Sequence, residues 1–316
     1  MLALGKKKFT GVSQFLARFR GWIQAGAALL TNLHLPNFLK GGLYQGAGKT
    51  VCVPGLNCYS CPAASGACPI GAFQAVVGSS KFSFSYYITG ILILLGVLLG
   101  RFICGFLCPF GWFQELLHKI PSRKLSTRKL KPLRYLKYAI LLVMVFLLPA
   151  FLVNDVGMGD PFFCKYLCPQ GVLEGAIPLS LANSGIRAAL GSLFTWKFGI
   201  LLVVIVLSVL FYRPFCKWIC PLGAFYALLN KVSLVQMKVD QSKCISCGKC
   251  AKACKMDVDV TKSPNHTECI RCGMCVRACP TNAVHFRCGF GTGKQGTVLP
   301  EKTNKQMNDI VKEKKS

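Results

Sequence analysis

The sequence predicts an α-helical membrane domain with an internal two-fold repeat, followed by a small α+β domain and a basic tail. Three observations lead to this fold class: long apolar blocks in the first two thirds of the chain, a change to polar composition from Lys231 onward, and cysteines that recur at short, regular spacings. We therefore expect a membrane domain at 1–232, a small domain at 233–288 and a disordered tail at 289–316.

The composition narrows the class of protein. Apolar residues make up 53% of the 316 residues, which is too many for an ordinary soluble protein. The chain also carries 38 Lys and Arg against 11 Asp and Glu. Such a basic chain could meet nucleic acid, an anionic membrane surface or an acidic partner. The apolar content favours the membrane, and we expect no nucleic-acid partner.

The apolar blocks predict about four transmembrane helices. The last three blocks approach the ~20 residues needed to cross ~30 Å of hydrocarbon. The first follows a basic leader and could be a marginal span or a signal peptide. We favour a retained helix, because its alanines are followed by further apolar chain. The four blocks are Trp22–Leu35, Tyr86–Leu99 (running on to Phe106), Tyr138–Val153 and Leu193–Tyr212.

Loop charges predict the orientation. Residues 101–137 carry nine Lys and Arg and one acid, whereas 36–85 and 154–192 carry few charges. Because basic loops stay in the cytoplasm, we expect 101–137, both termini and the small domain to be cytoplasmic. Segments 36–85 and 154–192 should then lie outside, in a multi-pass protein of the cell membrane.

The cysteines of the small domain form a doubled C-x2-C-x2-C-x3-C run, which is the spacing of bacterial two-cluster ferredoxins. Three close cysteines bind one corner of a 4Fe-4S cluster, and the fourth reaches the other cluster. Zinc or disulfides are the alternatives, and the doubled pattern disfavours both. One predicted cluster takes Cys244, Cys247, Cys250 and Cys279, and the other takes Cys269, Cys272, Cys275 and Cys254.

Outside this run, a C-P-x-G motif occurs four times, beginning at Cys68, Cys108, Cys168 and Cys220. Proline after cysteine favours the first turn of a helix. The cysteine then sits at the helix N-terminus, where amides and the dipole stabilise a thiolate. The alternative is that these are helix starts with redox-inert thiols. Three motifs have a further cysteine four residues earlier: Cys104, Cys164 and Cys216.

An internal repeat predicts how these motifs pair. Residues 101–119 align with 213–231, and the unit of span, outer motif, span and inner motif occurs twice. Two copies in one orientation imply a pseudo-two-fold axis along the membrane normal. We expect one further cluster on each side of the membrane, with disulfides as an alternative outside. The inner candidates are Cys104, Cys108, Cys216 and Cys220, and the outer candidates are Cys58, Cys61, Cys68, Cys164 and Cys168, with Cys52 as a sixth.

The CxxxCP pairs at helix ends, followed by a two-cluster ferredoxin run, resemble the polyferredoxin-like membrane proteins of the NapH and NosR type. The resemblance covers roughly residues 15–285. It implies electron transfer between a quinone pool or a cytoplasmic donor and an outer redox partner, often a flavin- or haem-bearing protein. The long outer flavin-binding region of the NosR type is missing here, so any flavin should belong to a partner.

Three functions follow as hypotheses. The first is an electron carrier whose basic small domain receives electrons from a soluble ferredoxin or flavodoxin. The second is a quinol dehydrogenase, with quinone as a further cofactor and His34 or His118 as assisting residues. The third is a redox sensor or metalloprotein assembly factor. The first is favoured, and we expect no catalytic residue in it.

Overall fold

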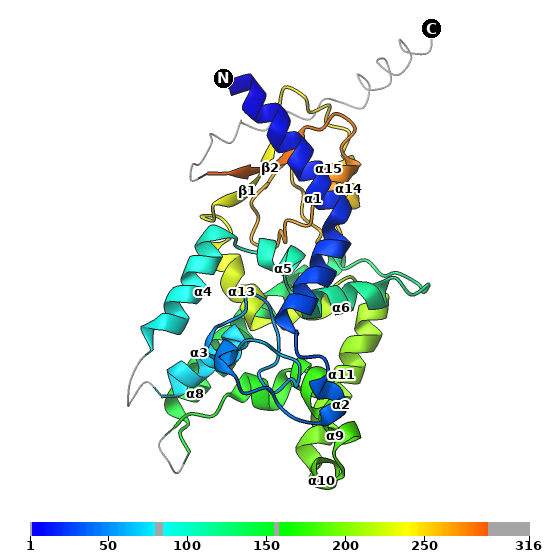
Figure 1. Ribbon diagram of the computed structural model, residues 1–316. Helices are drawn as coiled ribbons and strands as arrows, with labels where there is room; N and C mark the ends of the chain where they lie inside the picture. The colour runs from blue at the N-terminus through cyan, green and yellow to red at the C-terminus, as the bar shows by residue number, and fades with distance from the viewer. Residues whose placement is uncertain (1, 80–84, 155–157, 290–316) are drawn as a thin grey trace.

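The computed structural model describes residues 2–79, 85–154 and 158–289, and it is mostly helical. The small C-terminal domain lies at one end of the molecule, and α9 and α10 lie at the opposite end (Figure 1). Of the tail predicted at 289–316, residues 290–316 lie outside the described residues.

The first half of the chain is a series of helices joined by irregular loops. Two of them, α3 and α6, begin with proline directly after cysteine, where the missing N–H of proline costs no hydrogen bond. The elements are α1 (Leu2–Thr31), α2 (Asn37–Lys40), η1 (Ala47–Thr50), α3 (Pro69–Gly78), α4 (Tyr86–Leu98), α5 (Phe102–Phe106), α6 (Pro109–His118) and η2 (Arg128–Tyr135).

The second half is again a series of helices joined by loops, and it ends in the small domain. The elements are α7 (Leu136–Ile140), η3 (Leu141–Leu147), α8 (Leu148–Phe151), η4 (Phe163–Leu167), η5 (Val172–Ala176), α9 (Ile177–Ala182), α10 (Ser184–Ala188), α11 (Ser192–Leu210), α12 (Pro214–Trp218), α13 (Pro221–Leu229), β1 (Val235–Val239), α14 (Lys249–Ala253), α15 (Met274–Ala278) and β2 (Val284–Cys288).

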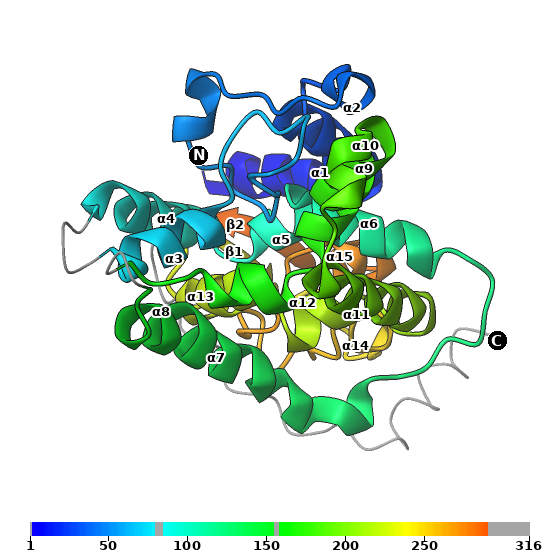
Figure 2. The ribbon, with the colours of Figure 1, turned by 90° about the horizontal axis from the view of Figure 1, so that it is seen from below.

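Two helical stretches are long and apolar enough to cross a membrane. Leu130–Phe151 combines η2, α7, η3 and α8, and Ser192–Leu210 is α11. Only 28% and 17% of their apolar windows are buried, so most of this apolar surface faces outward, unlike the core helix of a soluble protein. The first stretch lies along one edge of the molecule (Figure 2). These two stretches contain most of the third and fourth predicted spans.

The first two predicted spans are not matched by spanning helices among the described residues. Helix α4 has 13 residues, or about 20 Å at 1.5 Å per residue. It does not run on to Phe106, because the chain turns at Gly100 (φ 55°) and Arg101 is fully buried. At Gly100 a Cβ would lie 2.7 Å from the Arg271 guanidinium, so this turn also leaves room for the small domain.

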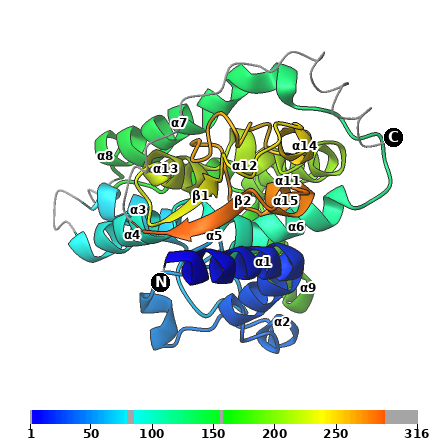
Figure 3. The ribbon, with the colours of Figure 1, turned by 90° about the horizontal axis from the view of Figure 1, so that it is seen from above.

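Helix α1 contains most of the first predicted span, and its earlier part packs on the small domain. The helix runs beside β2 and α15 (Figure 3). Phe286 N donates to Ser13 Oγ at 2.9 Å, and a Cβ on Gly273 would lie 2.6 Å from Ala17 Cβ. The other end of α1 meets the loops around residue 65, because Ser65 N donates to the Thr31 carbonyl.

The small domain has the expected α+β form. Strands β1 and β2 pair antiparallel, with Met237 opposite Phe286. Its helices α14 and α15 follow Gly248 (φ 67°) and Gly273 (φ 76°), a left-handed conformation that favours glycine. One apolar core runs from this domain into the helices, because Ile270 belongs to the same buried cluster as Ile103 and Leu222.

Candidate functional site

The cysteines of the small domain line two cavities. The cavities lie close enough for their thiols to interact. Burial raises the pKa of Cys275 most, and the neighbouring thiols, including Cys250 in the other cavity, raise it further. The grouping is the one that the spacing predicts, with each fourth cysteine taken from the other run. The first cavity is lined by Cys244, Cys247, Cys250 and Cys279, and the second by Cys254, Cys269, Cys272 and Cys275.

The four inner cysteines, Cys104, Cys108, Cys216 and Cys220, also come together, and all four are buried. Burial, then the thiols of Cys216 and Cys104, raise the pKa of Cys108 to about 12. Helix amides do point at the sulfurs, and Gly223 N donates to Cys220 Sγ at 3.3 Å. Burial nevertheless outweighs the helix N-terminus, so the pKa values of Cys108 and Cys220 rise where the sequence predicted stabilised thiolates.

Two fully buried arginines cross between the repeats at this inner site. Arg213 Nη1 donates to the carbonyl of Cys104, and Arg101 Nη2 donates to the carbonyl of Cys216 at 3.4 Å. The motif glycines leave room for them, since a Cβ on Gly111 would lie 2.9 Å from Arg213 Nη1. Among the described residues, Arg213 Nη2 is a buried donor without a hydrogen-bond partner.

These observations test whether a 4Fe-4S cluster suits the inner site. Such a cluster with four thiolate ligands is an anion, and two buried cations with an orphaned N–H donor suit an anion. A structural zinc ion would need its ligands about 2.3 Å from one point. No group of three or more His, Cys, Asp or Glu in the described part of the chain converges in this way. The residues fit the cluster better than a single ion.

The outer cysteines separate into four that meet and one that stays apart. A Cβ on Gly71 would lie 3.8 Å from Cys164 Sγ, and one on Gly171 would lie 3.6 Å from Cys58 Sγ. Burial, then Cys58 and Cys68, raise the pKa of Cys168 to about 12. The structure therefore brings together Cys58, Cys68, Cys164 and Cys168.

The fifth outer candidate, Cys61, faces a different neighbour. Its Sγ lies 3.6 Å from Asn32 Oδ1, and it is fully buried. Burial and then Glu174 raise its pKa to about 12. The sixth candidate, Cys52, forms a backbone bridge with Ala67, next to Cys68. The described cysteines form no disulfide, and Cys288 is exposed at the end of β2.

The inner and outer sites are adjacent in the fold, whereas the sequence predicted one on each side of the membrane. The backbone amides of Leu56 and Asn57 bond to the thiols of Cys108 and Cys68 respectively. Cys58 follows directly and belongs to the outer group. Two residues of extended chain span roughly 7 Å, far less than the ~30 Å of hydrocarbon. The expected separation by a bilayer is therefore wrong, because the loop around Leu56 folds inward between the two sites.

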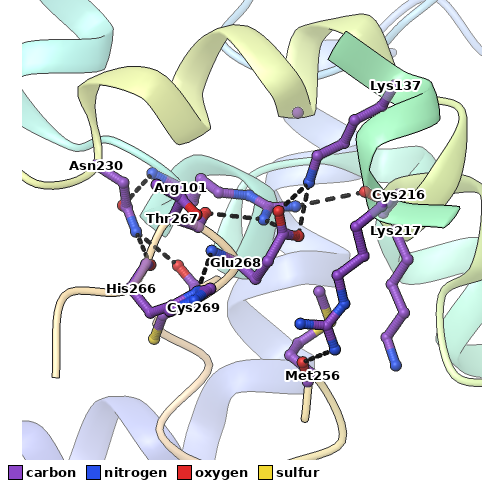
Figure 4. A network of polar contacts seen from close by, with 12 residues as sticks. Arg101, Lys137, Cys216, Lys217, Asn230, Met256, His266, Thr267, Glu268 and Cys269 are labelled. Carbon is purple, nitrogen blue, oxygen red and sulfur yellow. Dashed lines mark hydrogen bonds and ion pairs between the residues drawn. The ribbon is translucent and has the colours of Figure 1, made fainter. Parts of the chain in front are cut away.

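The inner site also touches the second cavity of the small domain. A Cβ on Gly105 would lie 2.3 Å from the Ile270 carbonyl, so the loop between Cys269 and Cys272 lies against α5. Asn230 Nδ2 donates to the carbonyls of His266 and Cys269 at 2.8 and 3.1 Å (Figure 4). The small domain is thus held directly against the helices that carry the inner cysteines.

A buried ion triad strengthens this contact. Glu268 accepts from Arg101 at 3.0 Å and from Lys137 at 2.6 Å (Figure 4). Burial alone would raise the pKa of Glu268, but Arg101 and Lys137 reverse that effect and lower it to about 2. No sequence motif marks Glu268 or Lys137. The only hints are that Glu268 lies beside Cys269 and that Lys137 lies directly before the third predicted span.

Two family matches cover most of the chain described above. A family described as "4Fe-4S binding domain" matches residues 66–87, 83–128, 137–177 and 193–240, which include the CPxG motifs. A second family of the same description matches 237–258 and 263–285. No solved structure matches the chain.

Several curated proteins are similar in sequence. Protein MJ0750 of Methanocaldococcus jannaschii, named as uncharacterized, is 28% identical over 54% of this chain and 66% of its own length. The putative electron transport protein YccM of Escherichia coli is 28% identical over 54% of this chain and 45% of its own. The ferredoxin-type protein NapH of Haemophilus influenzae is 28% identical over 48% of this chain and 66% of its own length. The chain thus matches about half to two thirds of the length of these relatives.

The thiol-lined cavities and the family matches define an iron–sulfur protein with binding domains for multiple 4Fe-4S clusters. Within that class, the chain is similar in sequence to ferredoxin-type electron transport proteins of the NapH and NosR type.

Proposed function

We propose that this protein is a membrane-bound electron conduit whose four sets of cysteines hold 4Fe-4S clusters in series. The small domain would hold two clusters in its two cavities, the inner site a third and the outer site a fourth. Bound clusters supply one-electron redox chemistry. The protein places the four sets, shields them from water and fixes the order in which they follow one another.

The observation that carries this proposal is the unbroken contact between neighbouring sets. Helices α14 and α15 pack together between the two cavities. The Ile270 carbonyl meets Gly105 between the second cavity and the inner site. Leu56 and Cys58 belong to one short segment between the inner and outer sites. A helical anchor with inert thiols would not need this chain of contacts.

The membrane location rests on the outward-facing apolar surface of the two long helices. Val203 and Val206 on α11 are both 58% exposed, and Phe151 is 74% exposed. Such surface is costly in water and suits lipid. We propose that both helices cross the membrane, and that α1 and α4 complete a multi-pass anchor. The small domain and residues 101–137 would face the cytoplasm, as the basic loop indicates.

We infer that electrons enter at the loop over the first cavity. Ile245, which lines that cavity, is 60% exposed. Lys243 and Lys249 are exposed on either side of it. An apolar centre with a basic rim fits an acidic soluble ferredoxin or flavodoxin. At the outer site, electrons would pass to a quinone or to a flavin- or haem-bearing redox protein.

The experiment that tests the proposal counts clusters. Anaerobically purified protein should contain iron for four clusters per chain, and the double variant Cys216→Ala/Cys220→Ala should lose the iron of one. An unchanged iron content in this variant would contradict the proposed inner cluster. A redox titration followed by EPR in membranes, with and without quinone, would then separate a conduit from a quinol dehydrogenase, which should turn over quinone in isolation.

A further inference from the structure

Two buried glutamines occupy the same position in the first two CPxG motifs. Gln74 follows Cys68 by six residues on α3, and Gln114 follows Cys108 by six residues on α6. Both side chains are fully buried. A buried amide must satisfy both its donor and its acceptor groups, so the partners of these two residues show what the position does.

The two amides make the same contacts. Gln114 Oε1 accepts from Phe215 N at 3.2 Å, and Gln74 Oε1 accepts from Phe163 N at 3.0 Å. Because each carbonyl end is bonded to a backbone N–H, each amino end must point the other way. There Gln114 Nε2 donates to Cys216 Sγ and Gln74 Nε2 donates to Cys164 Sγ, both at 3.2 Å.

Each glutamine therefore joins the two halves of one site. Gln114 stands on the helix that begins after Cys108, and its bonds go to Cys216 and the residue before it. Gln74 does the same between the motif of Cys68 and Cys164. Holding both the sulfur and the preceding amide fixes where the partner cysteine lies.

The other two motifs carry different groups at this position. Glu174 follows Cys168 by six residues, and it accepts from Cys58 N at 3.1 Å. Tyr226 follows Cys220 by six residues, and its hydroxyl donates to the Pro54 carbonyl at 3.1 Å. Each of the two sites thus has a glutamine that donates to a sulfur on one side and a different contact on the other.

An N–H donor aimed at a cysteine sulfur affects the redox state of a cluster held there. Reduction adds negative charge, and a donor stabilises that charge, so hydrogen bonds to sulfur raise the reduction potential. The effect is strong where water is excluded. A thiolate bonded in this way is also the better-oriented ligand.

We propose that Gln74 and Gln114 are positioning residues that hold Cys164 and Cys216 and raise the reduction potentials of the clusters at the outer and inner sites. The proposal rests on the proposed function, because it requires a cluster at each site. If wild-type protein holds iron only for the ferredoxin-like domain, the proposed function fails before any glutamine is tested.

The test replaces the donor at one site at a time in the full-length protein. Gln114→Glu keeps the acceptor for Phe215 N and removes the donor to sulfur, and Gln114→Met removes both. In each variant the iron content is measured, and every cluster potential is followed by EPR. We expect the inner-site potential of Gln114→Glu to become more negative while the other signals stay fixed. Gln74→Glu should shift only the outer-site signal.

Gln24→Met is the matched control. Gln24 is a buried glutamine whose amide donates to the Gly105 carbonyl at 2.9 Å and not to a sulfur. It should shift no potential. If Gln114→Glu and Gln74→Glu keep full iron and wild-type potentials, the proposal is overturned. It is also overturned if Gln24→Met shifts the inner-site potential as much as Gln114→Glu does. Loss of the inner cluster in Gln114→Met with retention in Gln114→Glu supports the positioning role.

Discussion

The Lys137 ammonium lies 2.6 Å from both carboxylate oxygens of Glu268. Lys137 belongs to a helix long enough to cross a membrane, and Glu268 directly precedes Cys269. Arg101 completes the contact from the start of the repeated segment at 3.0 Å. The side chains of both cations are fully buried. One carboxylate therefore fixes the small domain against the helices beneath it.

Removing the charge of Glu268 should loosen this attachment. Glu268→Gln leaves two buried cations without their partner, which costs about 3–5 kcal/mol for a buried pair. We expect a lower free energy of unfolding in detergent and faster proteolytic release of residues 233–288. Asp160→Asn is the control, because the Lys165–Asp160 pair is partly exposed and such pairs contribute about 0–1 kcal/mol. Equal effects of the two substitutions would contradict the buried triad.

The same triad predicts loss of stability in acid. Burial opposes ionisation, but the nearby cations outweigh it, and the pKa of Glu268 falls from 4.5 to about 2. Burial is outweighed likewise at Glu115, where Arg213 and Arg20 lower the pKa to about 2. A folded-state pKa below the unfolded value contributes stability that is complete above about pH 4.5 and is lost as the pH falls toward 2.

The measurement compares unfolding free energies of wild type and Glu268→Gln across that pH range. Acid lability of the clusters affects both proteins, so the difference between them isolates Glu268. The stability difference should be full near neutral pH and should shrink as the pH falls toward 2. A difference that does not change with pH would show that Glu268 is not the titrating group.

The sequence predicted the cysteine groups well because short spacings determine which thiols can meet. In the doubled run, each fourth cysteine, Cys254 or Cys279, groups with the other run. The CPxG repeat predicts which two motifs face each other. Local pattern alone could not choose among the outer cysteines. Cys58 and Cys61 are three residues apart, and only the fold turns one toward Cys168 and the other toward Asn32.

Long-range packing accounts for what the sequence could not predict. Hydropathy placed Tyr86–Phe106 in one span, yet the chain turns at Gly100 to bury Arg101 against Glu268. The repeat aligns Gln114 with Tyr226 and not with Gln74. The sequence repeat therefore gave no sign that Gln74 and Gln114 occupy the same position after their CPxG cysteines. The sequence analysis counted Arg101 among the loop charges, and Arg213 only begins the repeated segment. The burial of both depends on partners more than 100 residues away.

The choice between neighbouring outer cysteines gives a direct test. Cys58→Ala should lose the iron of one cluster, because Cys58 lies with Cys68 and Cys168. Cys61→Ala should keep all of its iron and cost only about 1 kcal/mol for a small cavity. Iron per chain and the EPR spectrum of the reduced protein are the measurements. Loss of iron from Cys61→Ala, with retention in Cys58→Ala, would reverse the assignment.

The basic rim around Ile245 predicts a charge effect on electron entry. Lys249→Glu should slow reduction by an acidic flavodoxin about three- to tenfold at low ionic strength, because charges at the rim of a contact mainly steer association. The effect should shrink as salt shortens the Debye length to about 8 Å at physiological strength. Stopped-flow absorbance of the clusters measures the rate. Lys238→Glu makes the same change of net charge at an exposed residue of β1 that does not line the first cavity. Equal slowing by both variants would show that the partner responds to overall charge, and electron entry at Ile245 would then be ruled out as its cause.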